Sequence, residues 1–222
     1  MKDETTKYEE TVRYLTIGEY ALLNQPGPLW LRGIDLEETD LYRINLKGAD
    51  LSHANLKGAN LTGANLEGTN FANAKLVGAS ISFTNLKGAI FTSAKLNGAS
   101  FMGAKLEGAD FDGADLTGAD LIKAKLEGAN FRMAWLPNTI LVKADLTKAN
   151  FTKAYLGGAN LSEANLTGAD FTEADLTYAY LGGANLTETN FTRTDITKAI
   201  LTEKDIYQAK LNGVVFRWGE SI

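Results

Sequence analysis

The 222-residue chain contains no cysteine, one histidine and three prolines. Without cysteine it forms neither a disulfide framework nor a thiolate metal site. It has no run of about 18 apolar residues, so we expect no membrane-spanning helix. Its first ten residues are highly charged and lack the apolar core of a secretory signal. These absences predict a cytoplasmic protein that does not enter a membrane.

The charge balance excludes a further class of function. Asp and Glu number 27 against 22 Lys and Arg, which gives a net charge of −5 and a pI of about 5.0. A protein that coats nucleic acid is expected to be basic. The composition therefore predicts no direct binding of nucleic acid.

The abundant feature of the sequence is a five-residue repeat. From Leu31 to Glu220 the chain divides into 38 consecutive pentads without insertion or deletion. Nearly every pentad begins with Leu, Phe or Ile, which we call the centre residue. The Ala position, two residues before the centre, holds Ala in 27 of the 38 pentads. The Asx position, directly before the centre, commonly holds Asn or Asp.

A period of five fits neither a helix nor a straight strand. On a helix the centre residues would rotate by about 140° per repeat and form no single face. On a strand an odd period would turn them alternately to opposite faces. A short extended stretch followed by a bend in every pentad resolves the conflict. The Ala position and the centre then both point inward, and the Asx position points outward.

A second period gives the number of sides. Phenylalanine occupies seven centres in a row at a spacing of 20 residues, which are Phe71, Phe91, Phe111, Phe131, Phe151, Phe171 and Phe191. Four pentads therefore make one coil. Glycine recurs at two opposite corners, where we expect the positive φ of a type II turn. The other two corners hold Lys, Glu, Asn and Met, and we expect a different turn there.

The predicted fold is all-β, a right-handed four-sided parallel β-helix of about nine and a half coils over residues 31–222. Parallel neighbours lie about 4.8 Å apart, which gives a rod of roughly 45 Å. The right hand is expected because parallel β connections almost always have it.

The runs Gly48-Ala49-Asp50-Leu51 and Gly58-Ala59-Asn60-Leu61 resemble the pentapeptide repeat family. The resemblance implies a right-handed quadrilateral β-helix. Proteins of this family are especially numerous in cyanobacteria, and most have no known activity. One branch of that family consists of DNA-mimicking, gyrase-binding proteins.

The two ends lie outside the regular repeat. Residues 1–30 predict an N-terminal helical cap that begins at Thr5 or Thr6 and ends before Gln25. A partner-binding helix is the alternative. At the other end Val215, Phe216 and Trp218 either plug the last coil or contact a second copy. The family resemblance implies a further possibility, because members of the gyrase-binding branch dimerise through their C-terminal ends: a homodimer through the C-terminal end.

No pattern in the sequence indicates catalysis, a cofactor or a metal site, and we predict that the protein is not an enzyme. The lone His53 is expected at an outward corner without a positioned partner. The acidic stretch from Asp110 to Asp115 lacks the residue order of a calcium loop.

Large apolar residues at outward positions give the one candidate site. We predict a partner-binding patch near the middle of the rod, composed of Met102, Ile122, Val142, Ile140, Met133, Trp135 and Tyr155. Lys123, Lys125 and Lys143 are expected around it. Exposed apolar patches often mark interaction sites, although scattered surface apolar residues also occur without a function.

Two functions follow from these observations. The first is a non-enzymatic protein-binding or scaffold protein with a rigid face and an unknown partner. The alternative is a DNA-mimic inhibitor or protector of gyrase, which requires acidic groups along the rod. The column Asp35, Asn55, Lys75, Lys95, Asp115 is interrupted by lysines and favours the first function.

Overall fold

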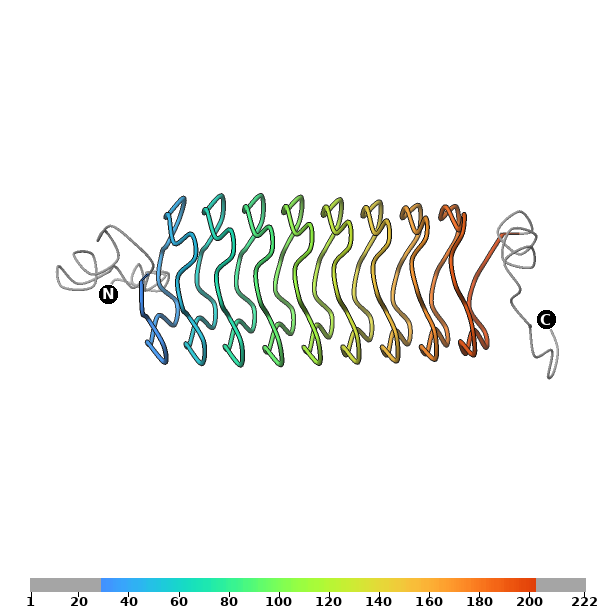
Figure 1. Ribbon diagram of the computed structural model, residues 1–222, viewed down its shortest axis with the longest axis horizontal. Helices are drawn as coiled ribbons and strands as arrows, with labels where there is room; N and C mark the ends of the chain where they lie inside the picture. The colour runs from blue at the N-terminus through green and yellow to red at the C-terminus, as the bar shows by residue number, and fades with distance from the viewer. Residues whose placement is uncertain (1–28, 203–222) are drawn as a thin grey trace, which may run out of the picture.

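The computed structural model describes residues 29–202, and over that range the chain forms a rod of stacked coils (Figure 1). This range contains no helix, and each strand is reduced to one bridging residue per pentad. Every bridge is parallel and joins an Asx position to the one 20 residues later, from Trp30↔Asp50 to Tyr180↔Ile200. The prediction of a four-sided parallel β-helix with four pentads per coil is confirmed.

Both predicted ends lie mostly outside the described residues. The ladder begins at Trp30, one residue before the predicted start, and the helical cap predicted over residues 1–30 is otherwise not described. The C-terminal residues Val215, Phe216 and Trp218 and the last predicted coil also lie outside the range.

We number the four faces by their centre residues. Face 1 has Leu31, Leu51 and then the phenylalanine column as its centres. Faces 2, 3 and 4 follow in chain order and begin at Leu36, Leu41 and Leu46. The first turn position follows each centre, and the corner position comes next. Corner 1–2 lies between faces 1 and 2, and the other corners are named in the same way.

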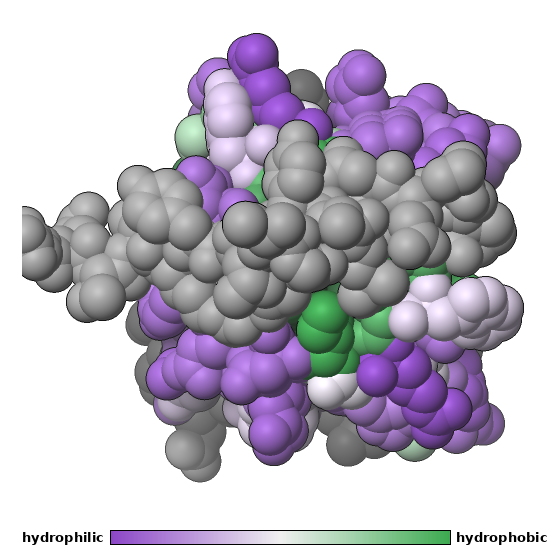
Figure 2. Space-filling model, turned by 90° about the vertical axis from the view of Figure 1, so that its left-hand side faces the viewer, coloured by the Kyte–Doolittle hydropathy of each residue, from purple (hydrophilic) through white to green (hydrophobic). Residues whose placement is uncertain are grey.

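The core runs along the whole rod. Most Ala positions and nearly all centres are buried, and the Phe rings of face 1 stack with centroids 4.6–5.4 Å apart and planes within 7°. Phe101 on face 3 contacts Phe91 and Phe111 edge-on. Figure 2 shows the rod from its N-terminal end, with hydrophilic residues around the periphery and hydrophobic ones toward the centre. Each coil thus buries the core of its neighbours, as in other solenoids.

The side chain at the Asx position accepts a hydrogen bond from the backbone N–H at the first turn position, two residues later. The side chain of Asp50 accepts a bond from the backbone N–H of Ser52, two residues later (3.0 Å), and another from the Asn70 side chain on the next coil (3.1 Å). The same pattern recurs along the rod, for instance where the Thr172 N–H donates to Asp170 (2.9 Å). Asn and Asp are therefore favoured here as Asx turns as well as stacking ladders.

All four corners share one backbone conformation. Each corner position has positive φ, at glycines such as Gly118 (64°) and equally at Lys123 (56°) and Met133 (55°). Each turn has positive φ at this position and not at the first turn position, as a type II turn has. The expectation of a different turn at the two glycine-poor corners was therefore wrong. Glycine lowers the cost of this conformation, but the hydrogen bonds between coils impose it on every residue type.

Candidate functional site: the apolar side chains of faces 2 and 3

The exposed large hydrophobic side chains are distributed unevenly around the rod. In the described range eight of the eleven belong to face 2, face 3 or the corners that follow them, namely Tyr42, Phe83, Met102, Trp135, Ile140, Tyr178, Tyr180 and Ile200. The remaining three, Trp30, Ile90 and Met133, belong to face 1 and its corner. Face 4 has none over residues 29–202, so two adjacent faces differ in chemistry from the rest.

On face 2, two aromatic residues form a stacked pair. Trp135 and Tyr155 occupy Asx positions on adjacent coils and are bridge partners. Their ring centroids lie 4.1 Å apart with planes inclined by 17°. Trp135 remains 50% exposed. We call these two residues the aromatic pair.

The chain is adapted to the aromatic pair at the turn beside it. An aromatic residue at an Asx position cannot accept the bond from the N–H two residues later. After Trp135 that residue is Pro137, which has no N–H. After Tyr155 it is Gly157, where a Cβ added to the glycine would lie 2.6 Å from the tyrosine hydroxyl oxygen. Gly157 lacks positive φ, so its missing side chain serves to make room for the ring.

On face 3, aliphatic side chains line up along three coils. Met102, Ile122 and Val142 occupy successive first turn positions, and Ile140 lies on the same face at an Asx position. Met102 and Ile140 are each 37% exposed, and the other two are half-buried. We call these four residues the aliphatic stripe. Beside it at corner 3–4, the ring of Phe83 lies over Gly103.

The structure divides the seven predicted residues into two groups. The aromatic pair, with Met133 at corner 1–2, occupies face 2, and the aliphatic stripe occupies face 3. Corner 2–3 separates them, with Pro137 and Asn138 in the coil that carries Trp135 and Ile140. Sequence reasoning missed Tyr178, Tyr180 and Ile200, which extend the apolar character of this side toward the C-terminal end.

Acidic residues lie on both sides of the aromatic pair. Asp115 is the bridge partner of Trp135 on the preceding coil, and Asp175 is that of Tyr155 on the following coil. Partial burial raises the pKa of the Asp115 carboxyl, but hydrogen bonds from Thr117 and Asn97 lower it more. The resulting pKa lies below its ordinary value, so Asp115 is charged at neutral pH.

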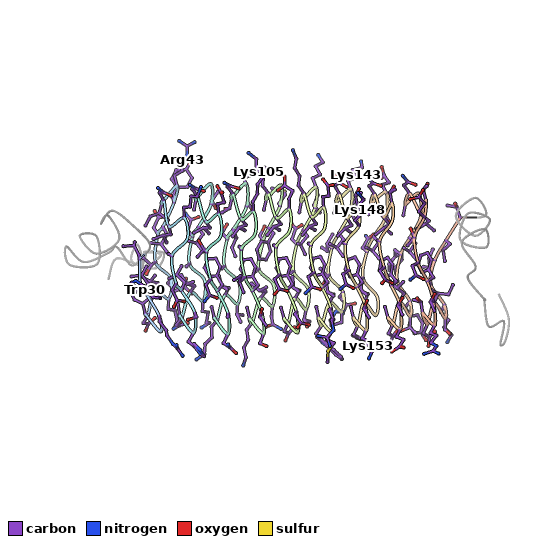
Figure 3. All side chains as sticks on the ribbon, in the orientation of Figure 1. Trp30, Arg43, Lys105, Lys143, Lys148 and Lys153 are labelled. Carbon is purple, nitrogen blue, oxygen red and sulfur yellow. The ribbon has the colours of Figure 1, made fainter. Side chains whose placement is uncertain are left out.

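The lysines do not surround the candidate site as predicted from the sequence. Lys123 and Lys143 lie at corner 3–4 beside the aliphatic stripe, and Lys143 pairs with Glu163 (3.3 Å). Lys125 occupies an Asx position of face 4. Lys143, Lys148 and Lys153 occupy three successive corners and project in different directions (Figure 3).

Within residues 29–202 no group of three His, Asp or Glu side chains is close enough to hold a metal ion. His53 lies exposed at corner 1–2, as predicted, with its Nε2 3.4 Å from the guanidinium of Arg32. No helix in this range is long and apolar enough to span a bilayer.

The repeat geometry agrees with a comparison against family models. The model of pentapeptide repeats matches in eight copies, over residues 31–68, 54–92, 94–132, 136–168 and 164–203. The chain belongs to the pentapeptide repeat family. Members of this family fold as right-handed quadrilateral β-helices and are generally non-catalytic scaffold proteins.

Solved structures of the family resemble the chain over most of its length. HetL, a pentapeptide repeat protein involved in heterocyst differentiation regulation from the cyanobacterium Nostoc sp. strain PCC 7120, is 28% identical. The match covers 85% of this chain and 98% of HetL, with a TM-score of 0.41. QnrB1, a plasmid-mediated fluoroquinolone resistance protein, is 23% identical over 82% of this chain and 90% of its own, with a TM-score of 0.58. The likeness to QnrB1 shows the shared fold. A comparison with curated protein sequences gives no significant match.

Proposed function

We propose that this pentapeptide repeat protein is a non-enzymatic binding or scaffold protein that presents faces 2 and 3 to a protein partner. The observation that carries the proposal is the aromatic pair together with its two adaptations, Pro137 and Gly157. At the position of Tyr155, Asn or Asp could accept a hydrogen bond from the Gly157 N–H, which typically contributes about 1 kcal/mol. After Trp135, Pro137 removes the donor itself. Residues that break a local structural rule are expected at functional sites.

The composition of the two faces supports a protein as the partner. Trp, Tyr and Met are enriched in protein–protein interfaces, and charged residues are depleted at their centres. The aliphatic stripe and the aromatic pair have this composition, whereas face 4 carries Lys, Glu and Asn at its outward positions. Each outward side chain also lies between neighbours on the two adjacent coils. Its conformation is therefore restricted before binding, and the loss of side-chain entropy on binding is small.

The charge distribution gives no support to the alternative of a DNA mimic that binds gyrase. Residues 29–202 carry 16 Lys and Arg against 19 Asp and Glu, a net charge of only −3. Every salt bridge in this range joins residues 20 apart, such as Arg132 to Asp112 (3.3 Å). Six of the 19 acidic residues are thus paired with basic ones along the rod axis. On face 2 the column of Asx positions is interrupted by Lys75, Lys95 and the aromatic pair, so it forms no continuous phosphate-like row. The likeness to QnrB1 extends to the fold alone.

Two further properties remain predictions. The homodimer through Val215, Phe216 and Trp218 depends on residues outside the described range. The cytoplasmic location is a prediction from the sequence, based on its charged first ten residues and on the absence of a long apolar run.

Affinity capture from a lysate of the source organism, analysed by mass spectrometry, tests the proposal. We expect the native chain to retain a protein that the Met102→Glu/Ile122→Lys variant does not retain, because charges on the aliphatic stripe would have to be desolvated in the interface. The matched control is Glu127→Lys/Thr147→Glu, which places charges at equivalent first turn positions of face 4. Circular dichroism establishes that all three proteins are folded. Retention of the same protein by both variants would reject faces 2 and 3 as the binding surface.

A further inference from the structure

We propose that the partner places cationic side chains, preferably arginine guanidinium groups, against the two outer ring faces of the aromatic pair, beside Asp115 and Asp175. The inference rests on the proposed function and specifies the chemistry of the partner at that site.

The stacking direction leaves two ring faces open. Trp135 and Tyr155 lie on adjacent coils, so their rings stack along the rod axis. The second face of the indole is therefore directed toward the coil of Asp115, and the second face of the phenol toward the coil of Asp175. An aspartate side chain is much shorter than an aromatic ring and cannot cover its outer part. The 50% exposure of Trp135 agrees with this arrangement.

Each open ring face is thus next to a carboxylate. Neither Asp115 nor Asp175 forms a salt bridge with another residue in the range 29–202. Their carboxylates accept bonds from the backbone N–H groups of Thr117 (3.0 Å) and Thr177 (2.8 Å). These neutral donors hold each carboxylate in place. Lys95, the bridge partner of Asp115 on the side away from Trp135, also favours the charged form of that carboxyl and lowers its pKa, without forming a salt bridge to it.

A ring face beside a carboxylate is suited to a cation. Cations are attracted to the faces of Trp and Tyr within about 6 Å of the ring centroid. The guanidinium group is planar, stacks on aromatic rings and donates hydrogen bonds to carboxylates. The basic residue at the adjacent corner, Lys153, is paired with Glu173 (3.6 Å) and does not occupy this position.

The spacing of the two carboxylates suggests the form of the partner segment. Asp115 and Asp175 are three coil steps apart, which is about 14 Å at about 4.8 Å per step. In an extended peptide, residues four apart lie on the same side at a distance of about 13 Å. An extended segment with basic residues at positions i and i+4 therefore matches both sites.

The test uses the full chain with Trp30→Phe and Trp218→Phe, so that Trp135 is the only tryptophan. The probe is a seven-residue peptide of glycine and serine with arginine at its second and sixth positions, titrated while Trp135 fluorescence is recorded. Three further peptides replace both arginines by lysine, by glutamine or by proline.

We expect the arginine peptide to bind more tightly than the lysine peptide, and the glutamine and proline peptides to bind at least tenfold more weakly. Asp115→Asn and Asp175→Asn should each weaken the arginine peptide about fivefold, and added salt should weaken it as well. The matched control is Asp145→Asn on face 4, where Asp145 accepts the same pair of bonds from Thr147. Asn occupies many Asx positions, so all three variants should fold.

Equal binding of the arginine and glutamine peptides, or no binding of either, would overturn the inference. Tighter binding of the proline peptide would overturn it in favour of a proline-rich partner. The proposed function is tested separately with the captured protein. If Trp135→Ala abolishes its retention and the Asp115→Asn/Asp175→Asn variant retains it fully, the binding surface stands and the cationic partner is rejected.

Discussion

Replacing Phe131 by Ala is expected to lower the free energy of unfolding by about 3–5 kcal/mol. The ring is fully buried and stacks between Phe111 and Phe151, with both centroid distances at 4.8 Å. Its removal leaves a cavity that the neighbouring coils cannot close, because hydrogen bonds fix their spacing. Urea denaturation followed by circular dichroism measures the change.

The matched control for this substitution is Phe191→Ala. Phe191 is near the end of the phenylalanine column and stacks on Phe171 at the longer centroid distance of 5.4 Å. We expect a smaller loss there, since the stability of a solenoid is close to a sum over neighbouring coils. A loss below about 1 kcal/mol at Phe131 would contradict the packing of the column, because large-to-small changes at buried rings cost more than this.

Replacing both Trp135 and Tyr155 by Ala is expected to weaken the affinity for the captured partner by at least a hundredfold. Buried aromatic residues near the centre of an interface typically contribute about 2 kcal/mol or more each. The free energy of unfolding should fall by no more than about 1 kcal/mol, because the side chains lie on the surface. Isothermal titration calorimetry and urea denaturation give the two quantities.

Trp30→Ala provides the control for the aromatic pair. Trp30 also occupies an Asx position, but it lies on face 1 and is 82% exposed. We expect no change in affinity from this variant. An equal loss from Trp30→Ala, or unchanged affinity without the aromatic pair, would show that the partner binds elsewhere.

The architecture could be predicted because the sequence repeats on two length scales. The five-residue period of the centres, at Leu46, Leu51 and Leu56, requires a bend in every pentad. The 20-residue period of Phe71 to Phe191 requires four pentads per coil. Both constraints act on buried side chains, where one misplaced residue would expose the core. The N-terminal cap has no such repeat, and its prediction depended on a short amphipathic pattern alone.

The corner conformations could not be predicted from glycine alone. Glycine indicates where positive φ costs least, but Lys123 and Lys143 adopt the same φ of 56° and 58°. Coil stacking imposes this geometry, since each corner N–H from Gly33 to Tyr178 donates to a carbonyl of the next coil, such as Lys123 to Val142 (3.0 Å). A long-range hydrogen bond of this kind leaves no local signal in the sequence.

The members of the candidate site were predictable, but its internal organisation was not. Outward apolar residues at a spacing of 20 pointed to Ile122 and Val142 and to the pair of Trp135 and Tyr155. The division between faces 2 and 3 and the stacking of the aromatic rings required the structure. One sequence signal does mark the aromatic pair: Pro137 is the only proline after residue 28, and it lies two residues after Trp135.

The most direct test of the binding surface is photo-crosslinking at Ile122 and, separately, at Glu127. The two residues occupy the same first turn position on adjacent faces of one coil, so a photoreactive side chain has the same backbone setting at both. In lysate, we expect a crosslink to the captured partner from position 122 on face 3 and none from position 127 on face 4. Crosslinks of equal yield from both positions, or from position 127 alone, would contradict this expectation.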